Sequence, residues 1–166
     1  MKTATCSSFY LNSIPSRFNT TTMRNFLLLL AISSLSVLSC KDQSDMEKIE
    51  GYLADNNLTA TSTPSGLYYI ITQEGSGGHP NLQSTVTVKY KGYRLNGMVF
   101  DETTGNNTAT FPLKNLILGW QEGIPLLKKG GKGTFFVPSN LGYGAQSVGD
   151  IPANSVLIFD IELVNF

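Results

Sequence analysis

The sequence predicts an α+β domain in which several antiparallel strands are covered on one face by a single short helix. From Leu67 onward, apolar residues recur at every second position, which is the spacing of strands buried on one face. Asn96 and Gly97 stand between the segments TVTVKYKGYRL and MVFD, and this dipeptide favours a tight turn between neighbouring antiparallel strands. Within this region one segment alone, residues 120–127, is predicted to be helical, with a couple of turns at most.

Four segments show strand character. Three of them alternate apolar and polar or outward-facing positions along their length, and the fourth follows the Gly130-Gly131 turn. They are residues 67–71, 86–91, 134–137 and 156–163.

Composition excludes several classes of function. The 166 residues include 12 Lys+Arg and 12 Asp+Glu, so the formal net charge is zero and no basic field is available to attract nucleic acid. The two cysteines, Cys6 and Cys40, both precede the predicted domain, and the single histidine, His79, lies in a Gly/Pro-rich loop. We therefore expect no metal, no disulfide and no cofactor in the domain. A nucleophile elbow or a phosphate-binding glycine loop is likewise missing from the sequence.

A leader precedes the domain. Met23 and Arg24 are followed by an apolar stretch over residues 26–38, which is shorter than the roughly 20 residues that a membrane-spanning helix needs. Its end, Val-Leu-Ser before Cys40, resembles the lipobox of bacterial lipoproteins, in which the cysteine receives a lipid and becomes the mature N-terminus. The lipid and an acyl chain would anchor the protein to a membrane. The alternative is an ordinary secretory signal that happens to contain a cysteine.

Residues 1–22 lack a helical or strand period and stand ahead of a complete leader, so we interpret them as an over-extended start. The alternative is a eukaryotic targeting extension, for which the glycosylation triplets at Asn19, Asn57 and Asn106 could be cited.

A short helix is predicted directly after Cys40. Met46, Ile49 and Leu53 share one helical face, and Ser44 stands three residues before Glu47 as in a capping box. Residues 59–66 are turn formers and read as a linker. Because a helix this short is unstable alone, it either packs on the domain or acts as a mobile tether. We expect residues 41–62 to be dispensable for catalysis.

The chain therefore divides into four parts. They are an over-extended start (1–22), a lipoprotein signal peptide (23–39), a lipidated cysteine with short helix and linker (40–63), and the domain itself (64–166).

Three sequence blocks resemble the FKBP-type prolyl isomerases across residues 64–166. They are VKYKGYRLNGMVFD, FPLKNLILGWQEGIPLLKKGGKGTFFVPSNLGYGA and IPANSVLIFDIELVNF, and their order and spacing are together highly specific. The resemblance implies a twisted antiparallel sheet wrapped around a short helix, with a ligand pocket between them.

The resemblance also implies a role for each of nine pocket residues. Trp120 would form the floor, and the polar catalytic contacts would come from Asp101 and Tyr143. The remaining members would bind substrate, three as walls and three as the rim: Tyr90, Phe100 and Phe159, and Leu116, Ile117 and Ile151.

An FKBP-type domain behind a lipoprotein leader implies cis/trans isomerisation of Xaa-Pro bonds in exported polypeptide clients. Macrocyclic FKBP ligands are possible further partners. Two alternatives remain open, namely a peptide-binding or chaperone module with little turnover and a structural lipoprotein that uses the fold as a spacer.

Three positions depart from the family pattern. Ala109 stands where many members carry an aromatic residue, Asn115 stands where an acidic residue is common, and the GNNTAT loop after Asp101 has no basic residue to pair with that carboxylate. We therefore expect the pocket to be open on one side.

Overall fold

The computed structural model describes residues 44–166, which belong to one compact unit. The predicted over-extended start, the predicted signal peptide and Cys40 lie outside the described residues. Within residues 44–166, no helix combines the length and the apolar character needed to cross a membrane.

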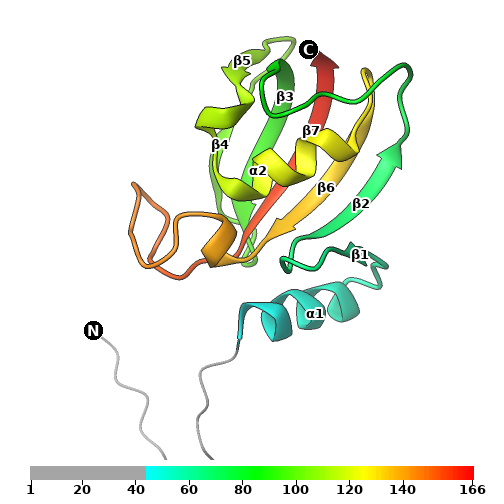
Figure 1. Cartoon of the computed structure of the whole chain (residues 1–166). Coiled ribbons are helices and arrows are strands. Elements are labelled where there is room, and N and C mark those ends of the chain that lie inside the picture. Colours follow the sequence, from blue (N-terminus) through cyan, green and yellow to red (C-terminus); the bar gives the residue numbers. More distant parts are fainter. Residues whose placement is uncertain (1–43) are drawn as a thin grey trace, which may run out of the picture. The chain divides into compact units, whose positions relative to one another are not determined.

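Seven strands form one antiparallel sheet (Figure 1). Their order is β1-β2-β6-β7-β3-β4, and β5 pairs with β3 beside β4. The strands are β1 (Thr61–Ser62), β2 (Tyr68–Gln73), β3 (Thr85–Arg94), β4 (Val99–Glu102), β5 (Ala109–Pro112), β6 (Lys132–Val137) and β7 (Leu157–Asn165). The helices are α1 (Asp45–Asp55) and α2 (Leu118–Gly123), with 3-10 turns η1 (Leu113–Asn115), η2 (Ile124–Leu126) and η3 (Ser139–Leu141).

The predicted fold class is confirmed, and the differences concern element boundaries and the two short strands β1 and β5, which the sequence did not predict. β2 begins at Tyr68 and β6 at Lys132, within two residues of the predicted starts. The tight turn is present, with Gly97 at φ 80° and its N–H bonded to the Arg94 carbonyl at 2.8 Å. The predicted linker contains β1, because Thr61 and Ser62 pair with β2 and make β1 the edge strand of the sheet, and sequence alone does not reveal such pairing.

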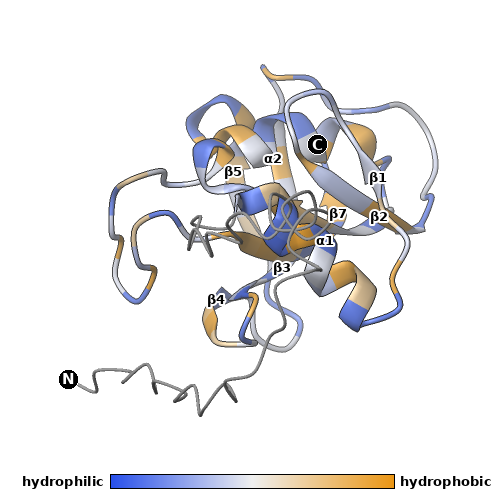
Figure 2. Ribbon diagram, turned by 90° about the horizontal axis from the view of Figure 1, so that it is seen from below, coloured by the Kyte–Doolittle hydropathy of each residue, from blue (hydrophilic) through white to orange (hydrophobic). Residues whose placement is uncertain are grey.

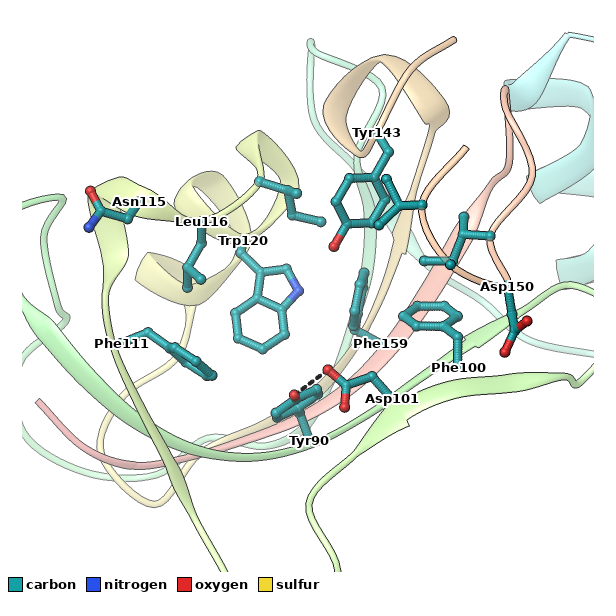
Figure 3. Close-up of a pocket in the computed structure, with 14 residues that line it drawn as sticks. Tyr90, Phe100, Asp101, Phe111, Asn115, Leu116, Trp120, Tyr143, Asp150 and Phe159 are labelled. Carbon is teal, nitrogen blue, oxygen red and sulfur yellow. Dashed lines mark hydrogen bonds between the residues drawn. The ribbon is translucent and has the colours of Figure 1, made fainter. Parts of the chain in front are cut away.

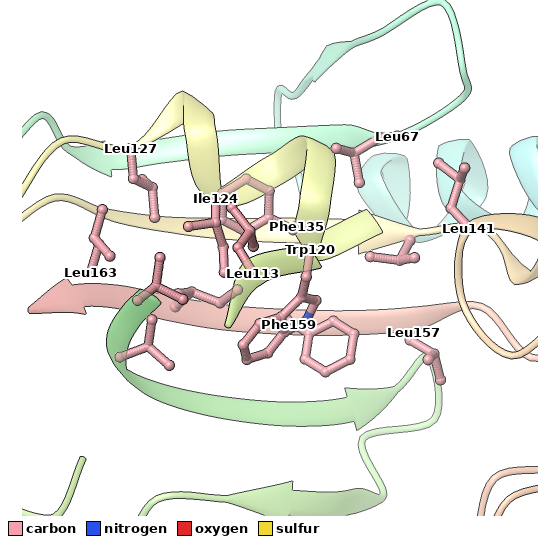
Figure 4. Packing of buried hydrophobic residues seen from close by; sticks show 14 of the residues in the cluster. Leu67, Leu113, Trp120, Ile124, Leu127, Phe135, Leu141, Leu157, Phe159 and Leu163 are labelled. Atoms are coloured by element: carbon pink, nitrogen blue, oxygen red, sulfur yellow. The ribbon is translucent and has the colours of Figure 1, made fainter. Parts of the chain in front are cut away.

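Helix α2 lies on one face of the sheet, here called the inner face (Figure 4). A Cβ atom on Gly119 would lie 2.5 Å from Val137, and one on Gly123 would lie 2.8 Å from Phe135, so the absence of side chains lets the helix approach β6 closely. The α-helix starts two residues before the predicted position and ends at Gly123. Pro125 cannot donate a backbone hydrogen bond, and the chain continues as the turn η2.

The inner-face core is formed by alternate residues of β3, β6 and β7 with α2 and η1. Its largest fully buried members are Leu67, Leu113, Ile124, Leu127, Phe135, Leu157 and Leu163. The strand alternation seen in the sequence therefore places the strand members Phe135, Leu157 and Leu163 on the face that α2 covers.

Helix α1 packs against the opposite, outer face of the sheet. Ser44 and Glu47 form the predicted capping box, and the ribbon of α1 carries both hydrophobic and hydrophilic residues (Figure 2). Ile49 and Leu53 are buried in a cluster with Phe136 and Ile158, whereas Met46 is 50% exposed. Of the two possibilities left by the sequence, packing rather than a mobile tether is correct.

Candidate active site

A pocket of about 510 Å³ opens between the inner face of the sheet, α2 and the segment that follows η3. All nine predicted site residues line it, although they come from β3, β4, α2, β7 and two loops. Five further residues also line it: Phe111, Asn115, Val148, Gly149 and Asp150. Figure 3 shows the aromatic members gathered around one space.

Trp120 stands at the centre of the aromatic set and is only 5% exposed. Its ring meets Tyr90 at 5.2 Å, Phe159 at 5.3 Å and Phe111 at 6.3 Å between centroids, each nearly perpendicular. Such edge-to-face contacts add to the stability that burial gives. The indole Nε1 is buried and has no hydrogen-bond partner among the described residues. The floor of the pocket therefore contains an N–H donor that no described residue satisfies.

The far wall depends on a glycine in the middle of β3. Phe100 and Phe159 meet edge to face with centroids 5.7 Å apart, and both rings lie over Gly92. A Cβ atom at Gly92 would stand 2.6 Å from Phe100 and 2.9 Å from Phe159. Because Gly92 has no side chain, the rings of Phe100 and Phe159 can pack against the backbone of β3 at this position.

Asp101 faces the pocket from β4, where it pairs with Gly92 of β3. The Tyr90 hydroxyl donates to Asp101 Oδ2 at 2.5 Å, drawn as the dashed line in Figure 3. Burial and this hydrogen bond hold the pKa of Tyr90 well above its usual value. Tyr90 therefore stays a neutral donor that orients the carboxylate at neutral pH.

Tyr143 closes the pocket from the opposite side and is 36% exposed. Its hydroxyl points toward the space in front of Trp120 and Phe159 (Figure 3). It makes no hydrogen bond to any other described residue, so it is available to a peptide carbonyl.

Phe111 is the aromatic pocket residue that sequence reasoning missed. It contacts both Trp120 and Tyr90 from β5. In β5 the partly buried residues are Ala109 and Phe111, while Thr110 and Pro112 are exposed, so the first two face the same side. Strand alternation could have found it, because Phe111 stands two residues after Ala109 and therefore faces the same side of the strand. Its aromatic ring forms a wall of the pocket on that side.

The charged side chains that line the pocket are all acidic. The charged lining residues are Asp101 and Asp150, and no lysine or arginine is among the lining residues. Asn115 lies at the edge with its amide directed away from the rings (Figure 3). Residues 44–166 hold no cluster of three or more His, Cys, Asp or Glu suited to a metal. His79 instead bonds the Pro125 carbonyl through Nδ1 at 2.9 Å.

Proteins of similar sequence occur in several bacteria. The chain is 43% identical over 123 residues to the FKBP-type peptidyl-prolyl cis-trans isomerase FkpA of Aeromonas hydrophila, covering 72% of this chain and 46% of that protein. It is 41% identical over 123 residues to the peptidyl-prolyl cis-trans isomerase Mip of Coxiella burnetii, covering 72% and 54%. The chain thus spans about half the length of these relatives.

Solved structures agree with the fold. The crystal structure of FkpA from Escherichia coli superposes with a TM-score of 0.67 at 35% identity, covering 74% of this chain and 58% of that one. A peptidyl-prolyl cis-trans isomerase from Pseudomonas syringae gives 0.64 at 27% identity, covering 73% and 92%. The family model for FKBP-type peptidyl-prolyl cis-trans isomerases matches residues 77–164. The chain belongs to the family of FKBP-type peptidyl-prolyl cis-trans isomerases.

Proposed function

We propose that this protein catalyses cis/trans isomerisation of Xaa-Pro bonds in exported polypeptides. The observation that carries the proposal is the pocket itself, in which aromatic walls surround a central tryptophan and polar groups stand only at the edge and floor. A pocket of this size and apolar character can enclose a proline ring and its neighbouring peptide groups.

The chemistry needs no acid/base pair. Rotation about the Xaa-Pro bond meets a barrier of about 18 to 20 kcal/mol because twisting destroys amide resonance. A twisted amide has less charge separation than a planar one and loses less hydration on entering an apolar site. Lowering the barrier by about 5 to 7 kcal/mol would bring an event that takes tens of seconds to roughly a hundred or more per second.

The polar groups would then orient the client peptide and favour the twisted amide over the planar one. The Tyr143 hydroxyl would hold a peptide carbonyl of the client, and the buried Trp120 Nε1 offers a second donor at the floor. Asp101, held by Tyr90, would act on the twisting amide through its field and hydrogen bonding more than on the planar ground state. In this proposal Asp101 and Tyr143 are the catalytic residues, and the apolar lining binds the proline.

A second function has one specific observation in its favour. No basic side chain forms an ion pair with Asp101 among the described residues, and the carboxylate is exposed at the pocket edge. A peptide-binding or chaperone module with little turnover would not need a basic partner for this carboxylate.

The test is proline-limited refolding of a client protein, measured with and without the full chain. We expect acceleration that a macrocyclic FKBP ligand abolishes. Refolding at the uncatalysed rate, together with saturable binding of a proline peptide, would establish the binding module instead. Absence of both binding and acceleration would support a spacer.

We further propose that a lipid on Cys40 anchors the protein in the cell envelope of a bacterium, with the outer membrane as the expected site. The support is the lipobox-like ending of the leader. Replacing Cys40 by Ser should move the protein from the membrane fraction to the soluble fraction. A Ser variant that stays in the membrane after a carbonate wash would contradict the lipid anchor.

A further inference from the structure

Helix α1 contacts the loop that carries Tyr143. The backbone N–H of Ser139 donates to Asp45 Oδ2 at 2.8 Å, across 94 residues of sequence. The other carboxylate oxygen of Asp45 accepts from Lys48 Nζ at 3.0 Å. Burial alone would raise the pKa of Asp45, but the hydrogen bonds from Ser139 and Lys48 outweigh it and hold the pKa below its usual value. The acceptor is therefore a carboxylate at neutral pH.

Ser139 in turn holds both neighbours of Tyr143. Its carbonyl accepts the N–H of Gly142 at 3.0 Å and of Gly144 at 2.8 Å. The Gly144 carbonyl accepts the N–H of Asn154 at 2.7 Å, which ties the same loop to the stretch after Ile151. Ser139 is thus fixed through its N–H by α1 and fixes, through its carbonyl, the two residues that flank the pocket tyrosine.

We infer that Asp45 is a positioning residue for the pocket, acting on Tyr143 through Ser139. The inference deepens the proposed isomerase function and rests on it for its kinetic consequence. Asp45 lies in α1 on the outer face and is not among the residues that line the pocket. Its effect would reach the client only through the placement of the Tyr143 hydroxyl.

The same helix offers a matched control. Glu50 Oε1 accepts from the Tyr68 hydroxyl at 2.7 Å, so it also joins α1 to the sheet through one carboxylate hydrogen bond. Tyr68 belongs to β2 and the outer-face cluster and does not line the pocket. A merely structural role predicts equal consequences for the loss of either contact, whereas positioning predicts different ones.

The experiment uses the full chain in detergent with the peptide Ala-Leu-Pro-Phe as probe. Binding is followed by the fluorescence of Trp120, the single tryptophan of the sequence, and kcat, KM and melting temperature are measured for Asp45→Ala, Asp45→Asn and Glu50→Ala. We expect Asp45→Ala to weaken peptide binding and raise KM by about threefold to tenfold with little change in kcat. Asp45→Asn keeps an oxygen acceptor and should recover most of this loss. Glu50→Ala should lower the melting temperature about as much as Asp45→Ala does, and it should leave KM unchanged.

A double variant tests the route. In a Tyr143→Phe background, Asp45→Ala should have a smaller effect on KM than in the wild type, because the hydroxyl it positions is already gone. Equal KM values for Asp45→Ala, Glu50→Ala and wild type would overturn the inference. Failure of Asp45→Ala to fold would also overturn it, because the contact would then sustain the whole domain rather than the loop. A wild-type protein without turnover would contradict the proposed function alone, since fluorescence binding still reports on Asp45.

Discussion

The two faces of the sheet are covered by helices of different length, and only one face has the aromatic pocket. On the outer face, the eleven residues of α1 bury Ile49 and Leu53 against Phe136 and Ile158. On the inner face, α2 has only six residues. Beyond this short helix, the aromatic side chains of β3, β5 and β7 are left to line a cavity. Incomplete cover of an apolar face therefore leaves room for the pocket.

Removing the cover of the outer face should have the largest effect on stability. The sequence suggested that residues 41–62 are dispensable for catalysis, but a chain that starts at Thr63 loses the burial of Ile49 and Leu53. At about 1.5 to 3 kcal/mol for each side chain, we expect the free energy of unfolding in urea to fall by about 3 to 6 kcal/mol. Met46→Ala, at a half-exposed position, should change it by less than about 0.5 kcal/mol. A truncated chain with the wild-type urea midpoint would show that α1 contributes nothing.

Trp120→Ala should damage both the inner-face core and the pocket. Loss of its three ring contacts should cost about 3 to 5 kcal/mol of stability. Binding of a macrocyclic ligand, followed by calorimetry, should be abolished in the folded variant. Ile49→Ala is the outer-face control, with a similar cost in stability and unchanged ligand affinity. Wild-type affinity in Trp120→Ala would place the binding site elsewhere.

Asp101→Ala should act on the rate more than on affinity. The carboxylate is exposed, so its contribution is expected near the lower end for charged hydrogen bonds, about 1.5 kcal/mol or roughly tenfold in kcat. Asp160→Ala removes a carboxylate that accepts from Thr134 on the outer face and should leave kcat unchanged. Wild-type kcat in the Asp101 variant would remove it from the catalytic residues.

Tyr143→Phe should weaken peptide binding while keeping the ring. One hydroxyl hydrogen bond is worth about 0.5 to 1.5 kcal/mol, so the dissociation constant should rise roughly twofold to twelvefold with little change in melting temperature. Tyr52→Phe supplies the outer-face comparison, because Tyr52 packs on Phe136 far from the pocket lining. Equal affinities in the two variants would show that the Tyr143 hydroxyl does not contact the peptide.

Alkaline pH should lower the stability of the domain through one tyrosine on each face, with a smaller effect than the substitutions above. Burial is the main cause that raises the pKa of Tyr90 on the inner face and of Tyr93 on the outer-face side, with Asp101 and Asp160 as the respective charged neighbours. Because the folded state holds these protons more tightly than the unfolded state, their contribution is complete below the ordinary tyrosine pKa of about 10 and is lost as pH rises beyond it. Urea unfolding above pH 10 should show decreasing stability, and Tyr90→Phe and Tyr93→Phe should each flatten part of the decrease. Unchanged slopes in both variants would contradict the shifts.

The strand alternation, the Asn96-Gly97 turn and the capping box at Ser44 were readable from sequence because each depends on residues that are close together in the chain. The order of the three sequence blocks also led to all nine predicted lining residues. Phe111 was missed as a site residue because its role comes from the pairing of β5 with β3, which sets Val86 opposite Phe111. The helix α2 was misplaced by two residues because its N-cap, Ile117, has no side-chain capping signal.

The sequence by itself determined which residues face each side of the sheet, since alternation along a strand is a local property. The order of its three blocks also led to nine of the fourteen residues that line the pocket. Only the tertiary structure decided that α1 packs on the outer face, that Phe111 closes a wall and that Asp45 reaches Ser139. Each of these depends on contacts between segments distant in the chain, and a local pattern carries no record of which distant segment will cover it.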